Sequence, residues 1–392
     1  MARSRTVLIA GAGIGGLAAA IALARENFRV IVFERSEAPE TSGAGIQLSP
    51  NATRALISLG ALDEVRARAI EPSALIVGNA LNRAVLAAAP LGARAQEMFG
   101  APYLVCLRAD LHNALMKVAG DYPDIELRYG TTLSDFAIHG RGVTALAERN
   151  RQTEEIPATA LIGADGIRSA IRLRLHGAAK PILRGMAAWR ATVSAAALPD
   201  DLRGKDDVRV WLGPGAHLVH YPVGDGSRIN LVAVTPDTHA TESWGEAADA
   251  NAMMPYFARW NEVPRAVLGQ AKEFRRWSLY DVPSLPFWGT GAVTLLGDAA
   301  HAMLPFIAQG AGSALEDAVV LAKHLREADN IASALRVYER ERMGRVRRMQ
   351  EAARFAGRVY HMAAPWWHGR DFVMEKIGGA GLMKRNDWIY RG

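Results

Sequence analysis

Two spacings of apolar residues recur along the chain, and each spacing assigns a segment to a strand or to a helix. Residues 6–10 (TVLIA) and 28–34 (FRVIVFE) are short apolar runs, typical of strands buried on both faces. Residues 17–26 (LAAAIALARE) lie between them and are mostly small, helix-forming residues. The first 34 residues therefore predict a strand, a turn, a helix and a second strand.

The spacing of apolar residues changes from mixed helix and strand patterns to mainly strand patterns in one part of the chain. Residues 181–280 carry longer strand-like runs, such as VRVWLG at 208–213, and predict a β-rich region. The remaining predicted elements are helices at 49–60 and 107–120, strands within 125–148, at 160–166 and at 292–298, and a mostly helical chain from about 311. This order predicts an α/β fold, in which a Rossmann-like domain holds an inserted β-sheet domain and a helical C-terminal region follows.

The turn after the first strand has the spacing G-x-G-x-x-G. Its glycines are Gly11, Gly13, Gly15 and Gly16. In this context Gly11 permits the tight turn, Gly13 lets a pyrophosphate approach the backbone, and Gly16 lets helix and strand pack closely. The helix N-terminus then holds the phosphate charge. Glu34, with Arg35 beside it, ends the second strand and can accept hydrogen bonds from an adenosine ribose. The motif predicts a dinucleotide without choosing between NAD and FAD.

Composition narrows the class of protein. The uncharged run 6–24 resembles an export signal or a short membrane span, but its glycines are spaced as a nucleotide motif, so neither is expected. The balance of 46 Lys+Arg against 40 Asp+Glu gives a net charge of only +6, which does not favour nucleic-acid binding. Cys106 is the single cysteine, which excludes an internal disulfide and fits a reducing cytoplasm.

Two further turns add chemistry far from Glu34. Residues 163–166 (GADG) follow a predicted buried strand, and Asp298 follows the apolar run 292–297. A single NAD would not need all three positions. An extended FAD has an adenosine ribose, a pyrophosphate and a ribityl chain, and would use each of them.

These motifs, in this order, resemble the three fingerprints of the class A flavoprotein aromatic hydroxylases. These are single-component FAD monooxygenases with the p-hydroxybenzoate hydroxylase-like fold. The matching segments are GAGIGG…FE, GADGIRS, GDAAHAMLPFIAQGAGSALEDA, GAGIQLSPNATRAL and LRADLHNAL. The resemblance spans roughly residues 6–350, and within the family it is strongest to salicylate hydroxylase and 6-hydroxynicotinate 3-monooxygenase. It is weakest in the β-rich region, where the substrate is chosen.

The resemblance implies a division of the chain into three parts. The expected boundaries are 1–72, 103–180 and 281–328 for the FAD-binding domain, 73–102 and 181–280 for the substrate domain, and 329–392 for the C-terminal helical region.

The resemblance also assigns residues to a non-covalent FAD. Asp298, after Gly297, corresponds to the acid that contacts the ribityl hydroxyls, and Arg108 corresponds to an arginine that contacts FAD. Asp165 and Gly166 correspond to a pair associated with both FAD and the nicotinamide nucleotide. From the residues alone, Asp165 also suits a turn, and Arg108 also suits an exposed helix position.

The segment that begins at Gly297 contains an apolar stretch and a glycine turn. The stretch around Pro305 is expected to line one side of the isoalloxazine ring. Gly310, Ala311 and Gly312 form a turn whose backbone N–H groups can reach the N1–O2 edge of that ring. This arrangement would stabilise the anionic reduced flavin.

A helix is expected to follow that glycine turn and to open on the acidic pair Glu316 and Asp317. Its positive end would point at the same edge of the flavin. His301 is expected to be a structural hydrogen-bonding residue rather than a covalent flavin anchor.

The chemistry that the resemblance implies needs two further reactants. NADH or NADPH delivers hydride to FAD, and the reduced flavin reacts with O2 to give a C4a-hydroperoxide that hydroxylates an activated aromatic ring. The chain has no second G-x-G-x-x-G for the nicotinamide nucleotide. That agrees with enzymes that bind the reductant transiently.

One predicted strand offers groups for the substrate. The period of two in HLVHY places His217, Val219 and Tyr221 on one face of that strand. By resemblance, His217 is the candidate to accept or relay the phenol proton and Tyr221 the candidate hydrogen-bonding partner. An imidazole that titrates near neutral pH suits this task, although both residues could simply fill a half-exposed sheet. Gln47 replaces a histidine of 6-hydroxynicotinate 3-monooxygenase, so a phenolic carboxylate such as salicylate is preferred.

The C-terminal region carries weaker signals. His361 and His368 flank Trp366 and Trp367, but no acid or cysteine accompanies them at ligand spacing, so no metal site is expected. The tryptophans are expected to cover a surface of the core or a dimer contact. Residues 338–360 predict a helix packed by one apolar stripe, with a solvated basic face.

The sequence therefore predicts an FAD-dependent monooxygenase that hydroxylates a small aromatic acid with O2 and NADH or NADPH, as a monomer or a homodimer. Three alternatives remain open. They are a hydroxylase of a bulkier polyketide or quinone-type substrate, a flavin oxidase or reductase without oxygen insertion, and a non-catalytic flavin-binding protein.

Overall fold

The computed structural model describes residues 5–39, 44–177, 180–237 and 245–392. One large sheet has five strands in the order β18-β11-β1-β2-β7, with parallel pairing throughout. Its strands are β1 (Thr6–Ala10), β2 (Arg29–Glu34), β7 (Ile125–Tyr129), β11 (Ala160–Gly163) and β18 (Val293–Leu295). Parallel pairing at the centre explains the apolar runs, because both faces of β1 are covered and Val7, Leu8 and Ile9 are fully buried.

The second large sheet has eight strands in the order β16-β17-β12-β15-β14-β13-β4-β5. These strands are β4 (Ala74–Asn79), β5 (Val85–Pro90), β12 (Ile182–Ser194), β13 (Val208–Gly213), β14 (Ala216–Val223), β15 (Arg228–Pro236), β16 (Glu246–Ala248) and β17 (Phe274–Asp281). Two sequence segments therefore contribute to one sheet, since β4 pairs with β13 in a parallel register. The exact domain boundaries stay a prediction.

Two smaller sheets and most of the helices surround these layers. The small sheets contain β8 (Thr132–His139), β9 (Gly142–Arg149) and β10 (Gln152–Ala158), and β3 (Gly45–Leu48) with β6 (Leu104–Leu107). The helices before the C-terminal region are α1 (Ile14–Arg25), α2 (Pro50–Leu59), α3 (Leu62–Arg66), α4 (Gly92–Phe99), α5 (Arg108–Gly120), α6 (Ala170–His176), α7 (Glu262–Gly269) and α8 (Asp298–His301). The helix predicted at 49–60 is confirmed as α2, with Gly60 left-handed at its C-cap.

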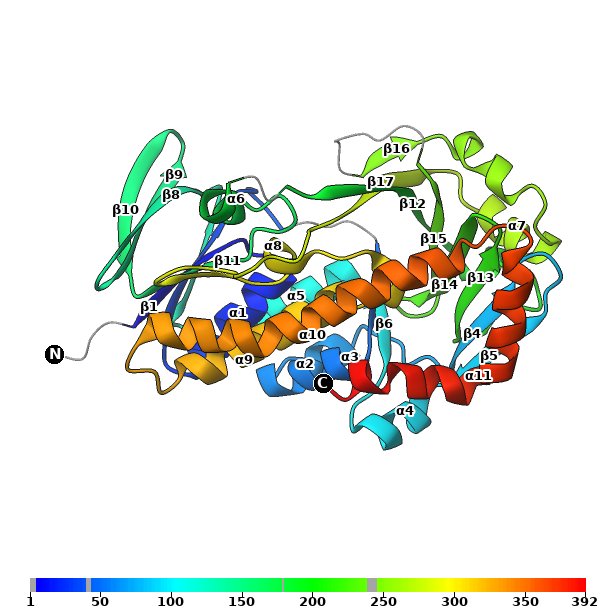
Figure 1. The fold of residues 1–392 in the computed structure, drawn as a ribbon, viewed down its shortest axis with the longest axis horizontal. Helices are drawn as coiled ribbons and strands as arrows, with labels where there is room; N and C mark the ends of the chain where they lie inside the picture. Colours follow the sequence, from blue (N-terminus) through cyan, green and yellow to red (C-terminus); the bar gives the residue numbers. More distant parts are fainter. Residues whose placement is uncertain (1–4, 40–43, 178–179, 238–244) are drawn as a thin grey trace.

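Three helices complete the chain, namely α9 (Gly310–Leu325), α10 (Ile331–Tyr360) and α11 (Trp366–Tyr390). Figure 1 shows α10 running past the parallel sheet toward the eight-stranded sheet, where α11 covers β5. A Cβ atom on Gly379 would lie 1.7 Å from the carbonyl oxygen of Ala88, so a glycine is needed where α11 meets β5. No helix in the described ranges is long and apolar enough to cross a membrane.

The C-terminal region departs from two expectations. The helix predicted at 338–360 is present as α10, but Arg342 is only 4% exposed, so one of its basic residues lies in the core. Trp366 is 73% exposed, so it does not cover the core, and the alternative of a dimer contact stays a prediction. The spacing of apolar residues in α10 cannot show that Arg342 pairs with two acids of α9, Glu316 and Asp317, in the core.

Candidate active site

The glycine turn after β1 has the geometry that a dinucleotide motif needs. Gly11 has φ +102°, a conformation that residues with side chains rarely adopt. A Cβ atom on Gly16 would lie 1.9 Å from the carbonyl oxygen of Gly11, so the close packing of turn and helix requires glycine. Gly13 is the N-cap of α1, and none of the described atoms lies within 4 Å of the position that its Cβ would take. The first N–H groups of α1 can therefore face phosphate oxygens.

The acid at the end of β2 lies beside this turn because β1 and β2 are parallel neighbours. Glu34 accepts hydrogen bonds from the N–H groups of Ala12, at 3.0 Å, and Ser36, at 2.9 Å. Arg35 is exposed next to it. Gly15 packs inward, where a Cβ would lie 2.8 Å from Leu296. Glu34 thus fixes the turn, and its carboxylate oxygens keep further lone pairs for a ribose.

The turn after β11 joins this edge of the sheet. Asp165 accepts hydrogen bonds through Oδ2 from the N–H groups of Ala170, at 2.7 Å, and Ile171, at 3.2 Å, and so holds the start of α6. Its other oxygen, Oδ1, is buried and has no partner among the described residues. Burial raises the pKa of Asp165. Gly166 follows with φ +77°. The turn-forming interpretation of Asp165 is correct, and its contact with a cofactor stays a prediction.

Asp298 lies two residues beyond Leu296, after Gly297, at the start of α8. Asp298 is exposed at the molecular surface. The protein around it still removes part of its hydration, and this raises the pKa of its carboxyl group. His301, Arg108 and Arg172 act in the opposite direction, since their charges lower that pKa. Arg108 opens α5, and its backbone N–H donates to Ala44 O at 2.8 Å. The fold thus brings together an acid and an arginine that are far apart in the sequence.

The glycine-rich segment before α9 differs from the prediction. Gly310, Ala311 and Gly312 are not a separate turn, because α9 begins at Gly310. Glu316 and Asp317 therefore lie in the second turn of the helix rather than at its opening, and both are buried. Glycine and alanine can start a helix when tertiary contacts hold the segment, and this places their free N–H groups at the positive helix end.

A buried ionic cluster holds α8, α9 and α10 together. His301 contacts Asp317 at 2.5 Å, and Arg342 of α10 donates to the same carboxylate at 2.7 Å. Asp317 also accepts from the backbone N–H of Gly297 at 3.0 Å. The pKa of Asp317 is lowered to about 2 by the charges of His301 and Arg342, against the effect of burial. His301 therefore has the structural role that was expected.

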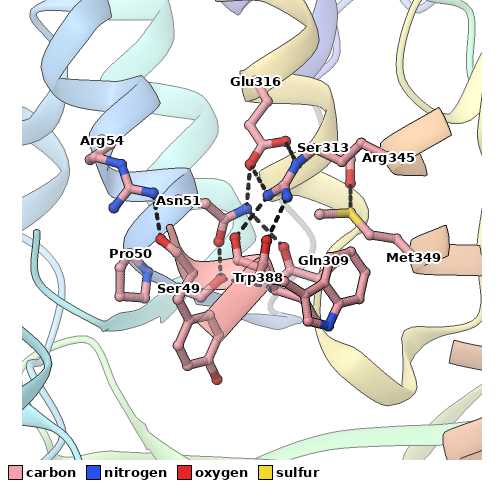
Figure 2. A network of polar contacts seen from close by, with 12 residues as sticks. Ser49, Pro50, Asn51, Arg54, Gln309, Ser313, Glu316, Arg345, Met349 and Trp388 are labelled. Carbon is pink, nitrogen blue, oxygen red and sulfur yellow. Dashed lines mark hydrogen bonds and ion pairs between the residues drawn. The ribbon is translucent and has the colours of Figure 1, made fainter. Parts of the chain in front are cut away.

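Figure 2 shows a second network, which the sequence did not predict. Gln309, directly before α9, donates through Nε2 to Ser49 Oγ at 2.7 Å and accepts from Asn51 Nδ2 at 2.9 Å. Asn51 also donates to Glu316, which in turn accepts two hydrogen bonds from Arg345. The start of α9 is thereby tied to α2 and α10. The sequence signal for this network was weak: Gln309 directly precedes Gly310 in the segment that the family resemblance places beside the flavin.

His217 and Tyr221 lie on one face of β14, together with Val219, and both side chains are almost fully buried. The hydroxyl group of Tyr221 lies against β3, where a Cβ on Gly45 would be 2.8 Å from it. Gln47, also on β3, accepts a hydrogen bond from Tyr103 at 2.7 Å and interacts with Tyr221. Gln47 and Tyr221 thus lie together.

His217 has a partner that the sequence analysis did not connect with the substrate site. Its Nδ1 lies 2.8 Å from Nε2 of His361, just after α10. Its ring also packs edge-on against Phe306, 5.5 Å away between centroids, and Phe306 follows Pro305 in the half-buried segment η4 (Pro305–Ile307). Burial and the neighbouring His361 lower the pKa of His217 well below its usual value. The expectation of titration near neutral pH is therefore wrong for this environment.

The residues at this edge fit FAD. Open space above Gly13, the unpartnered Oδ1 of Asp165 and the exposed carboxylate of Asp298 form successive polar positions at the ends of β1, β11 and β18. The glycine start of α9 offers N–H groups to an anionic ring edge. These positions would hold the pyrophosphate, the ribityl chain and the flavin in turn. The individual assignments stay a prediction.

Comparison with known proteins agrees with this geometry. A family model described as "FAD binding domain" matches residues 4–353. The chain is 37% identical over 393 residues to 3-hydroxybenzoate 6-hydroxylase of Klebsiella oxytoca, covering 100% of this chain and 97% of that one. It is 33% identical to 6-hydroxynicotinate 3-monooxygenase of Pseudomonas fluorescens, covering 89% of this chain and 90% of that one.

A solved structure extends the likeness to three dimensions. A salicylate hydroxylase–substrate complex has a TM-score of 0.84 to this chain at 27% identity, covering 99% of this chain and 95% of that one. The family match, the relatives and the shared fold all span nearly the whole chain. The chain therefore belongs to the FAD binding domain family and, within it, to the FAD-dependent aromatic hydroxylases.

Proposed function

We propose that this protein hydroxylates a small phenolic carboxylate with O2 and NADH or NADPH, and that 3-hydroxybenzoate is the first substrate to test. The observation that carries this proposal is the face of β14, where His217 lies against a second histidine and Tyr221 lies on the same side. The likeness along the whole chain to 3-hydroxybenzoate 6-hydroxylase supports the choice of ring acid. We also infer a cytoplasmic monomer or homodimer.

The residues suggest how the site acts on a phenol. FAD, when bound, supplies hydride uptake from the nicotinamide and the activation of O2. Because Nδ1 of His217 is engaged with His361, the proposed acceptor of the phenol proton is Nε2. Removing that proton makes the ring more electron-rich and therefore more nucleophilic. Burial lowers the pKa of the free imidazole, which keeps it in the neutral form that accepts a proton but also makes it a weaker base. The proposed role is therefore to relay the proton rather than to hold it. Tyr221 can hydrogen-bond and orient the substrate.

The test is to measure NADH and NADPH oxidation with 3-hydroxybenzoate, salicylate and 6-hydroxynicotinate, while quantifying hydroxylated product. Oxidation with near-stoichiometric product supports the proposal. Oxidation without product on any ring acid would indicate an oxidase or reductase. The absence of any oxidation would indicate a flavin-binding protein without turnover. Product only from larger polyketide or quinone-type compounds would contradict the small-acid assignment.

Denaturation of the purified protein is expected to release FAD and no FMN. The reason is that the Gly11–Gly16 turn and Glu34 are arranged for the adenosine half, which FMN lacks. The released flavin can be identified by chromatography before and after phosphodiesterase treatment. Recovery of FMN, or of a tightly held NAD, would contradict the assignment of the turn.

A further inference from the structure

Arg190 places a positive charge on the sheet face that carries His217 and Tyr221. It lies on β12, where the register pairs it with Val232 of β15, and Val232 pairs with Val219 of β14. Residues paired across antiparallel strands project to the same side of the sheet. Arg190 therefore shares a face with Val219 and with the two substrate candidates that flank it. This shared face cannot be read from the sequence, because the three strands meet only in the folded sheet.

The guanidinium group of Arg190 lacks a counter-charge within the described residues. Its Nε atom is buried there without a hydrogen-bond partner. The nearest ring is that of Trp277, whose centroid is 5.4 Å from the guanidinium carbon. Burial lowers the pKa of Arg190, and the titratable groups that act on it are Tyr221 and Arg108, with no carboxylate among them. Such a group carries a desolvation cost that a bound anion would offset.

Three other half-buried arginines, on β12, β13 and β17 of this sheet, are arranged differently. Each of them is paired with an aspartate, in the pairs Arg184–Asp281, Arg209–Asp207 and Arg276–Asp237. Those arginines are neutralised by the chain itself. Arg190 is partly covered rather than fully packed, so its charge stays accessible to a ligand on that face.

We propose that Arg190 binds the carboxylate of the aromatic substrate. The inference rests on the proposed function and adds the residue that would select a ring acid over a neutral phenol. Neighbouring strands are about 4.8 Å apart, so the backbones at Arg190 and Val219 are roughly 10 Å apart. A hydroxybenzoate fits that span, with its carboxylate at the planar guanidinium and its hydroxyl toward His217. A guanidinium can hold a carboxylate through two parallel hydrogen bonds.

The experiment compares two ligands that differ only in charge. Binding of 3-hydroxybenzoate and of neutral 3-hydroxybenzamide to the FAD-loaded protein is measured from the change in flavin absorbance. R190Q is expected to weaken 3-hydroxybenzoate about 10- to 100-fold, and to leave 3-hydroxybenzamide unchanged. R190K, which keeps the charge without the planar fork, should lie between. R275Q is the matched control, because Arg275 lies on β17 directly opposite Arg190 of β12 but is exposed. It should leave the binding of both ligands unchanged.

The outcomes separate this inference from the proposed function. Equal weakening of both ligands in R190Q would overturn the carboxylate assignment. Loss of FAD affinity, with unchanged discrimination between the two ligands, would assign Arg190 to the flavin and also overturn it. A wild-type protein that binds neither ligand would overturn the proposed function first, and this inference with it.

Discussion

Replacing His217 with alanine is expected to lower kcat on the true substrate by about 10²–10⁴-fold, the usual range for loss of a general base. The phenol would then have to ionise without a positioned acceptor. The FAD content should stay intact, because His217 contacts His361, Phe306 and Tyr360 rather than the glycine turn or Asp298. Steady-state turnover, with the flavin content measured in the same preparation, checks this result.

The pH dependence makes this test specific. Burial and the neighbouring His361 lower the pKa of His217, so the imidazole is neutral, and can accept a proton, at neutral and alkaline pH. The H217A defect should therefore shrink as the pH approaches the phenol's own pKa, near 10, where the substrate ionises unaided. His220 is the matched control, since it lies on the opposite face of β14 and contacts Trp211 at 3.0 Å. H220Q should keep normal turnover, and wild-type turnover in H217A would exclude the proposed proton route.

Replacing Asp298 with alanine is expected to weaken FAD binding by about 2–4 kcal/mol, which corresponds to roughly 30- to 1000-fold in the dissociation constant. A carboxylate that accepts from ribityl hydroxyls makes charge-assisted hydrogen bonds, and alanine makes none. The exposed position of Asp298 at the start of α8 leaves its oxygens free for such bonds. Titration of apoprotein with FAD, followed by flavin fluorescence, measures the effect.

Two further variants sharpen the measurement. D298N keeps one acceptor oxygen without the charge and should give an intermediate loss of FAD affinity. D225A changes an exposed acid in the turn between β14 and β15, where Asp225 bonds only to Ser227 among the contacts described, and should bind FAD normally. Unchanged FAD affinity in D298A would remove Asp298 from the cofactor site.

The local pattern of apolar residues and glycines was sufficient to predict the strand–turn–helix–strand unit at the start of the chain. The run TVLIA, the glycines at 11–16 and the strand ending at Glu34 specify a strand–turn–helix–strand unit, because each depends only on near neighbours. The period of two also placed His217 and Tyr221 on one face without knowledge of the sheet. Backbone sterics and burial act over a few residues, so these features are readable from the sequence.

The start of α9 shows where local pattern is insufficient. The glycines at 310 and 312 suggested a turn, and Glu316 and Asp317 suggested a helix N-terminus. In the fold, Arg342 and Arg345 of α10 neutralise both acids, and Gln309 is held by α2, so the helix begins earlier. The deciding contacts come from residues that are distant in the sequence, and no local preference encodes them.

The chemistry of the substrate face has the same origin. His361 was considered only as a metal ligand, and Arg190 was not singled out, because nothing beside either residue in the chain marks a role at the substrate face. Only the packing of α10 against β14, and the pairing of β12 with β15, brings them to His217 and Tyr221. The sequence by itself determined the fold class and the cofactor turn through short-range sterics and burial. The tertiary structure alone decided which charges and imidazoles meet, because those encounters depend on strand order and helix packing.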